Sequence, residues 1–314
     1  MTHKASAERV SLAGYLDERR ADIEAALSAV LPDAPECPPV VRDAMRYSLL
    51  AGGKRLRPIL CLASADSVGG DRALAMSAAC AIELIHTYSL IHDDLPAMDD
   101  DVMRRGRPTL HVVAGEGMAI LAGDGLLTEA FHLLAREPVT SDPAIAARKL
   151  RVIETIAAAA GPVGMVGGQA LDLASVATGP SGEPPAPVDR DALATMHRKK
   201  TGALIRASAR AGAIMGGGNE AQLTAIDRAA SELGLAFQIV DDILDVEGAS
   251  VDLGKTAGKD AASGKTTYPG LFGLDASKQM ARDCLDRARA ALEAAGMADA
   301  RLLGIGRWIV ERSK

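Results

Sequence analysis

Apolar residues recur with helical spacing along nearly the whole chain. The segment from Asp71 to Asp94 reads DRALAMSAACAIELIHTYSLIHDD, with an aspartate at its start and no proline. It is apolar on most sides, as is SELGLAFQIVDDIL at 231–244, so both are predicted to be central, buried helices. Similar periodicity predicts further helices at 8–30, 40–50, 115–136, 142–160, 188–215, 219–246, 275–295 and 298–312.

Glycine and proline mark the breaks between these helices. VATGPSGEPPAPVD at 176–189 is a predicted connector, and GGGNE at 216–220 is a predicted turn. The region 247–269 is a long polar loop, rich in glycine and lysine, and loops of that length are usually functional or disordered. No shift in composition marks a domain boundary, so we expect one all-α domain, a large helical bundle over 1–314.

The composition supports helices rather than a sheet. Apolar residues make up 48% of the chain but aromatic residues only 3%, and strands prefer β-branched and aromatic side chains. The net charge of -6 disfavours a nucleic-acid-binding surface, so no nucleic-acid partner is expected. The cysteines are scattered without a CxxC pair, which predicts reduced thiols in a cytoplasmic protein: Cys37, Cys61, Cys80 and Cys284.

The N-terminal residues and the apolar stretches bear on membrane targeting. MTHKASAERVSLAGYLDERR has charges throughout and no hydrophobic segment of a signal peptide. The longest uncharged apolar stretch, around 156–166, is too short to span a bilayer. The expectation is a soluble protein with no stable membrane insertion.

Two acidic clusters stand at the ends of apolar helices. DDLPAMDDD contains Asp93, Asp94, Asp99, Asp100 and Asp101, and DDILD contains Asp241, Asp242 and Asp245. Carboxylates at a helix C-terminus oppose the helix dipole, and buried ones need partners. A hard cation resolves both conflicts, because magnesium takes oxygen ligands and shares its shell with phosphates. A single DDxxD run is more often a solvated helix end, but the pair of runs predicts a metal site.

Basic clusters suit the anion that such a metal would share. GGKRLRP at 52–58 carries Lys54, Arg55 and Arg57, and RRG at 104–106 follows the first acidic cluster. HRKKTG at 197–202 and GKTAGKD at 254–260 add further lysines. Arginine and lysine are the usual phosphate ligands, although each cluster alone could be a solvated surface. Together with the acidic clusters they indicate a diphosphate–magnesium site.

Two other kinds of site fit the sequence less well. GKT at 254–256 and at 264–266 does not complete a P-loop, because Ala249 and Lys259 stand where the motif requires glycine. An all-helical metal-dependent phosphohydrolase would use His86, His92 and Asp93, but imidazole ligands favour a transition metal and carboxylates outnumber histidines here. The phosphohydrolase remains an alternative of a different class.

At this point the motifs resemble those of the trans-isoprenyl diphosphate synthases (the polyprenyl synthetase family), specifically the bacterial farnesyl diphosphate synthases. The resemblance covers nearly the whole chain in family order: GGKRLRP, DDLPAMDDDVMRRGRPTLH, GGQALDL, HRKKTGALI, FQIVDDILD and GKTAGKDAASGKTTYPGL. It implies a helical bundle around a deep central cavity, with the two aspartate motifs facing each other across its mouth. It also implies condensation of isopentenyl diphosphate with dimethylallyl or geranyl diphosphate.

The resemblance also implies residue roles. About three magnesium ions would bridge the allylic diphosphate and Asp93, Asp94, Asp99, Asp241 and Asp245. The same diphosphate would be held by Arg104, Lys200 and Lys255, with Thr201 and Gln238 at the reacting carbons beside Phe237. Isopentenyl diphosphate would bind Lys54, Arg57, His86 and Arg105. The implied catalytic set is therefore Lys200, Thr201, Gln238, Asp93, Asp94 and Asp241.

Product length would depend on the depth of the cavity. Tyr88 lies five residues before Asp93, roughly 7–8 Å along a helix, where a bulky side chain could close the pocket floor. The resemblance assigns Tyr88 with Ser89 to farnesyl synthases, whereas Tyr88 could also be an ordinary core aromatic residue. Geranylgeranyl or geranyl diphosphate synthase activity stays open as an alternative.

Other members of the superfamily fit less well. The complete second DDxxD and the GGKRLRP site separate the chain from terpene cyclases. Non-catalytic regulatory subunits have lost aspartates that are present here. The family is usually homodimeric, so a homodimer acting on small diphosphate substrates is expected.

Overall fold

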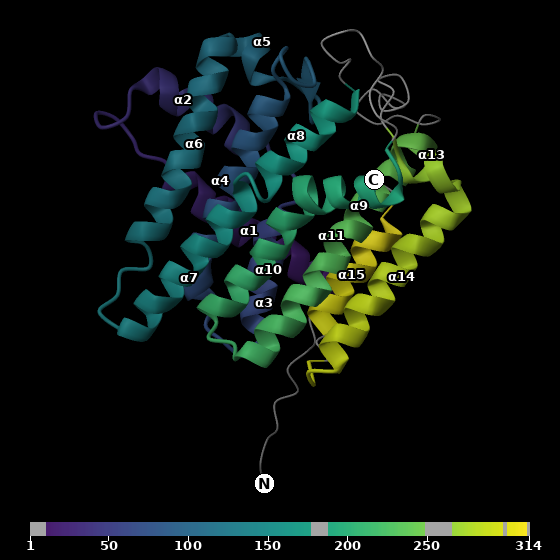
Figure 1. Cartoon of the computed structure of the whole chain (residues 1–314). Coiled ribbons are helices and arrows are strands. Elements are labelled where there is room, and N and C mark those ends of the chain that lie inside the picture. Colours follow the sequence, from purple (N-terminus) through teal and green to yellow (C-terminus); the bar gives the residue numbers. More distant parts are fainter. Residues whose placement is uncertain (1–10, 177–187, 249–265, 298–299, 313–314) are drawn as a thin grey trace.

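The chain folds almost entirely into α-helices. The computed structural model describes residues 11–176, 188–248, 266–297 and 300–312 (Figure 1). From the N-terminus the first helices are α1 (Leu12–Val30), α2 (Pro39–Leu49), α3 (Leu56–Ser67), the 3-10 turn η1 (Arg72–Ala75), α4 (Met76–Asp93), α5 (Leu110–Ala114), α6 (Glu116–Arg136), α7 (Pro143–Ala160) and α8 (Met165–Val176). The remaining ones are α9 (Arg190–His197), the π-helical turn η2 (Arg198–Gly202), α10 (Ala203–Met215), α11 (Glu220–Gly248), α13 (Tyr268–Phe272), α14 (Leu274–Glu293) and α15 (Ala300–Glu311). The all-α prediction is confirmed, since the described strands are the two-residue pair β1 (Met103–Arg104) and β2 (Arg107–Pro108).

Helix α4 lies inside the bundle, as its uninterrupted apolar pattern predicts. It packs against α1, α3, α6 and α10, while α11 packs against α10 and α14 (Figure 1). Small side chains let the helices come close. A Cβ added at Gly212 of α10 would lie 2.6 Å from the carbonyl carbon of Cys61 in α3, so the α3–α10 crossing requires glycine there. The aspartates that end α4 and lie near the end of α11 are therefore carried on two well-packed helices.

The predicted helices at 71–94 and 219–246 are confirmed, with η1 forming the first turn of the former. Two helices of 12 residues were missed, as were the five-residue helices α5 and α13. Helix α3 carries Pro58 in its first turn, where its missing N–H is tolerated. Helix α8 follows the glycine-rich stretch 161–168. The predicted helix over 188–215 contains the π-helical turn η2 between α9 and α10, and such turns often mark functional sites.

Most of the two predicted connectors lies outside the described residues. Residues 177–187 and 249–265 are not described, so the predicted roles of Lys255 and Lys259 cannot be placed on the structure. The described ends are capped. Asp189 accepts a hydrogen bond from the Ala192 N–H at the start of α9, and Thr267 accepts one from the Gly270 N–H at the start of α13.

Three helical stretches are long and apolar enough to cross a membrane by length and composition alone: 72–93, 116–136 and 143–175. They are longer than the stretch around 156–166 that the sequence singled out. The first includes α4, and 67% of its most apolar window is buried inside the bundle. Its apolar character is thus accounted for by packing against other helices.

Candidate active site

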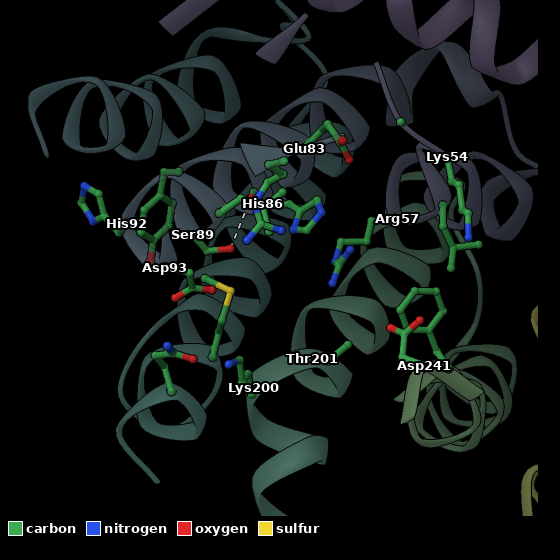
Figure 2. A pocket seen from close by; sticks show the side chains of 18 of the residues that line it. Lys54, Arg57, Glu83, His86, Ser89, His92, Asp93, Lys200, Thr201 and Asp241 are labelled. Atoms are coloured by element: carbon green, nitrogen blue, oxygen red, sulfur yellow. Dashed lines mark hydrogen bonds between the residues drawn. The ribbon is translucent and has the colours of Figure 1, made fainter. Parts of the chain in front are cut away.

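A cavity of about 830 Å³ opens between the helices that carry the two aspartate motifs. Figure 2 shows Asp93 and Asp241 on opposite sides of it, with Lys200 and Thr201 between them and Lys54 and Arg57 near Asp241. The cavity is lined by most of the predicted site residues, namely Lys54, Arg57, His86, Tyr88, Ser89, Asp93, Arg104, Arg105, Lys200, Thr201 and Asp241. Asp94 and Asp99, which follow α4, and Gln238 and Asp245 of α11 are not among the lining residues in the described part of the chain.

Asp93 is the last residue of α4 and points into the cavity. Burial raises the pKa of its carboxyl to about 6, with the neighbouring carboxylates of Asp99 and Asp94 adding to the shift. Lys200 and Arg104 oppose it. Because ionisation of this carboxyl is unfavourable, a nearby cation would stabilise its charged form.

Asp94 and Arg104 pair with each other. Asp94 is 4% exposed, and its Oδ1 lies 2.7 Å from Arg104 Nε and 2.6 Å from Nη2. Burial raises the pKa of Asp94, while the hydrogen bond from Arg104 lowers it. The pair ties the end of α4 to the β1–β2 hairpin. In this arrangement the two residues that were expected to hold metal and diphosphate hold each other.

The hairpin presents Arg105 to the cavity. Arg104 pairs with Arg107 across a two-residue turn whose central residues, Arg105 and Gly106, have φ of 52° and 73°. Positive φ at both positions is the pattern of a type I′ turn, which matches the twist of a hairpin. Arg105 Nη1 donates to the carbonyl of Gly52, and a Cβ at Gly53 would lie 2.8 Å from its guanidinium carbon. Two segments far apart in sequence therefore meet at this guanidinium.

Arg57 and Arg105 form a cationic end of the cavity, together with the imidazole of His86. Arg57 Nε is buried without a hydrogen-bond partner, and burial lowers the Arg57 pKa. Burial and the surrounding arginines, Arg57 first, hold the pKa of His86 well below its usual range, so the imidazole is neutral at pH 7. Buried positive charge with an unused donor is the arrangement that an anion such as a diphosphate would satisfy.

Arg55, although it lies in the same GGKRLRP motif, has a different role. Its side chain is fully buried, with Nε 2.7 Å from Glu24 and Nη1 2.7 Å from Glu83. It also donates to the carbonyl of Leu49 at 2.7 Å. Arg55 also borders the cavity, but its donors are occupied by structural contacts, whereas Arg57 Nε has no hydrogen-bond partner.

Lys200 and Thr201 project from the π-helical turn η2. Lys200 Nζ lies 2.5 Å from Asp172 Oδ2 of α8, and the close α8–η2 approach depends on Gly168, where a Cβ would lie 2.5 Å from the Lys200 Cα. The side-chain amide of Gln169 also lines the cavity, buried and without a hydrogen-bond partner. Asp172 and Gln169 were not assigned roles from sequence, although the GGQALDL motif contains both.

Asp241 is paired across 71 positions of sequence. Arg312 Nη2 lies 2.6 Å from Asp241 Oδ1 and 3.1 Å from the carbonyl of Phe237, and its guanidinium carbon is 4.1 Å from the Phe237 ring centroid. No signal in the sequence identified Arg312. Beside it, Asp242 is buried and accepts a hydrogen bond from the Tyr268 N–H at 3.0 Å, so it anchors α13.

Tyr88 forms part of the cavity wall below Asp93. Its side chain is 7% exposed, and its ring meets the His92 ring edge-on. The Ser89 hydroxyl donates to the carbonyl of His86 at 2.9 Å. The predicted position of a bulky residue beneath the aspartates is consistent with this placement.

The donor set fits magnesium better than a transition metal. Within the described residues, no three or more His, Cys, Asp or Glu side chains lie close enough together to hold a metal ion. Magnesium usually binds one or two carboxylates and completes its shell with water and substrate phosphate. Asp93 and Asp241, on opposite sides of a cavity with a cationic end, suit ions that are shared with a diphosphate.

Comparisons with known proteins agree on a family. The polyprenyl synthetase family profile matches residues 38–298. Farnesyl diphosphate synthase of Geobacillus stearothermophilus is 47% identical over 86% of this chain and 88% of its own length. Geranylgeranyl pyrophosphate synthase 3 of Arabidopsis thaliana is 49% identical over 85% of this chain and 72% of its own length.

A solved structure extends the agreement to the fold. The crystal structure of an FPP/GFPP synthase from Zymomonas mobilis, in its apo form, superposes with a TM-score of 0.81 at 38% identity. The match covers 95% of this chain and 98% of that one. Because the family profile, the relatives and the fold all agree, the chain belongs to the polyprenyl synthetase family and is a trans-prenyl diphosphate synthase.

Proposed function

We propose that the enzyme condenses isopentenyl diphosphate with dimethylallyl and then geranyl diphosphate and releases farnesyl diphosphate. The observation that carries the product length is Tyr88, a largely buried aromatic side chain in the cavity wall five residues before Asp93. The farnesyl diphosphate synthase from Geobacillus supports the same product. Geranylgeranyl diphosphate is the second candidate product, because several relatives at similar identity are named as geranylgeranyl pyrophosphate synthases.

In the proposed reaction the C–O bond of the allylic diphosphate breaks, a C–C bond forms to the isopentenyl double bond, and a proton is lost. Asp93 and Asp99 on one side, with Asp241 and Asp245 on the other, would hold Mg²⁺, which neutralises the leaving diphosphate when bound. Lys200 and Arg104 add positive charge at the same group. The cationic end formed by Arg57, His86 and Arg105, with Lys54 beside it, would bind the isopentenyl diphosphate.

The carbocation formed by ionisation needs shielding from water and nearby dipoles. The Thr201 hydroxyl and the Gln238 amide are the proposed dipoles, and the Phe237 ring at the cavity wall can contribute its face. The carboxylates of the site are assigned to metal or to basic partners. We therefore assign the final proton to an oxygen of the departing diphosphate.

The test is incubation with isopentenyl diphosphate, magnesium and each allylic diphosphate in turn, followed by chromatography of the dephosphorylated alcohols. Farnesol as the main product supports the proposal. Geranylgeraniol as the main product supports the second candidate. Release of phosphate or pyrophosphate without C–C bond formation would reject both and favour a hydrolase.

We further propose a cytoplasmic location, which the free cysteines Cys37, Cys61, Cys80 and Cys284 support, and a homodimer. Support comes from the apolar side chains exposed on α5 and α6, where Val112, Val113 and Leu121 are 51%, 54% and 54% exposed. Light scattering coupled to size exclusion gives the test. A monomer at micromolar concentration would contradict the proposal.

A further inference from the structure

His92 lies one helical turn after Tyr88 and on the same face of α4. Their ring centroids are 5.6 Å apart at an interplanar angle of 80°, an edge-to-face contact. Both side chains line the cavity. Since residues four apart on a helix are neighbours, the His92 ring stands directly beside the aromatic ring that is proposed to stop the product.

The His92 ring is in turn fixed against α6. Its Nε2 is 3.1 Å from the carbonyl oxygen of Ile120, so the Nε2–H tautomer donates there. A Cβ added at Gly123 would lie 2.5 Å from His92 Cδ2 and 2.9 Å from Cε1. The absence of a side chain at Gly123 therefore makes the recess that accepts the imidazole.

A tyrosine ring can end chain growth only if it stays in place as the tail reaches it. Each added isoprene unit buries further apolar surface, which favours any rearrangement that deepens the cavity. An aromatic side chain on a helix has more than one allowed χ1 rotamer, and a swing of Tyr88 would open the floor. A neighbour that is itself fixed restricts that swing.

We propose that His92 is a positioning residue for product length, acting through Tyr88. The contacts from Tyr88 to His92 and from His92 to Gly123 join α4 to α6 and hold the tyrosine ring in the cavity wall. This inference rests on the proposed function, because it presupposes that Tyr88 is the stop. His92 touches no diphosphate in this scheme, so its effect belongs in the product ratio rather than in substrate affinity.

The test compares the ratio of geranylgeraniol to farnesol in wild type, Tyr88→Ala, His92→Ala and His92→Gln. The glutamine keeps a donor for the Ile120 carbonyl but removes the ring, which guards against loss of the α4–α6 packing. His132→Ala is the matched control, because His132 lies on α6 with 58% of its side chain exposed and pairs locally with Glu129. We expect both His92 variants to raise the ratio by about two- to tenfold, the effect of losing one edge-to-face aromatic contact. The KM for isopentenyl diphosphate should be unchanged, and the control should match wild type.

The double variant Tyr88→Ala/His92→Gln separates action through Tyr88 from an independent effect. We expect its ratio to equal that of Tyr88→Ala alone. A further rise in the double variant, or an unchanged ratio in both His92 variants while Tyr88→Ala lengthens the product, would overturn the role of His92. An unchanged ratio in Tyr88→Ala would overturn the proposed stop itself, so the two failures are distinguishable.

Discussion

Gly168 of α8 should control catalysis through its contact with η2. A Cβ there would lie 2.5 Å from the Cα of Lys200, and backbone atoms of η2 cannot rotate away from it. Since carbon atoms pack at about 3.5 Å or more, Gly168→Ala must separate α8 from η2 by about 1 Å. That movement displaces both Lys200 and Thr201, which line the cavity, and stretches the 2.5 Å contact between Lys200 and Asp172.

The magnitude follows from two opposing terms. Overpacking costs roughly 1–3 kcal/mol of folding stability, and alanine recovers up to about 1 kcal/mol of helix propensity, so the fold should survive. A displacement of about 1 Å at reacting groups can lower the rate by about 100-fold. We therefore expect kcat of Gly168→Ala to fall by about 100-fold, with a small loss of thermal stability.

Steady-state kinetics and thermal unfolding measure the two effects. The matched control is Gly212→Ala, which forces a similar clash at the α3–α10 crossing, where a Cβ would lie 2.6 Å from the Cys61 carbonyl carbon. It should lose comparable stability and keep the kcat of the folded protein. A wild-type kcat in Gly168→Ala, or an equal loss in both variants, would refute the reasoning.

Three further predictions follow from the ion pairs and pKa values. Arg55→Leu should destabilise the protein by about 3–5 kcal/mol in chemical unfolding, because it leaves Glu83 buried without its partner. Arg57→Leu should unfold like wild type and raise the KM for isopentenyl diphosphate. The reverse result would contradict the separate roles of the two arginines. Burial raises the pKa of Asp93 to about 6, above its unfolded value, so its ionisation destabilises the metal-free protein as the pH rises through the acid range. The Mg²⁺ affinity measured by calorimetry should therefore fall by up to about tenfold per pH unit below 6. An affinity that stays constant down to pH 5 would contradict a role of Asp93 in binding the metal. Arg312→Ala should tighten Mn²⁺ binding to the substrate-free protein by about fivefold, the equivalent of ~1 kcal/mol, because it removes the cation paired with Asp241. Electron paramagnetic resonance measures this binding. Weaker binding in the variant would show that Arg312 supports the metal site instead.

The helices and the acidic ends of α4 and α11 could be predicted from sequence. Apolar periodicity is a local property, so the core helices at 71–94 and 219–246 were predicted close to their observed bounds. The family resemblance likewise identified many of the charged side chains that line the cavity, but not its apolar lining. Helix α3 was missed, although proline in a first turn is compatible with a helix.

Only the tertiary structure decided how the charged residues are paired. Arg55 and Arg57 are two residues apart in one motif and both border the cavity, but Arg55 is paired with Glu24 and Glu83 on other helices, while Arg57 Nε has no hydrogen-bond partner. Arg312 reaches Asp241, and His92 fits against Gly123, across long separations in sequence. Periodicity fixes which face of a helix is apolar, but the partner of a charge or a ring depends on which helices pack together, and that is a property of the whole bundle.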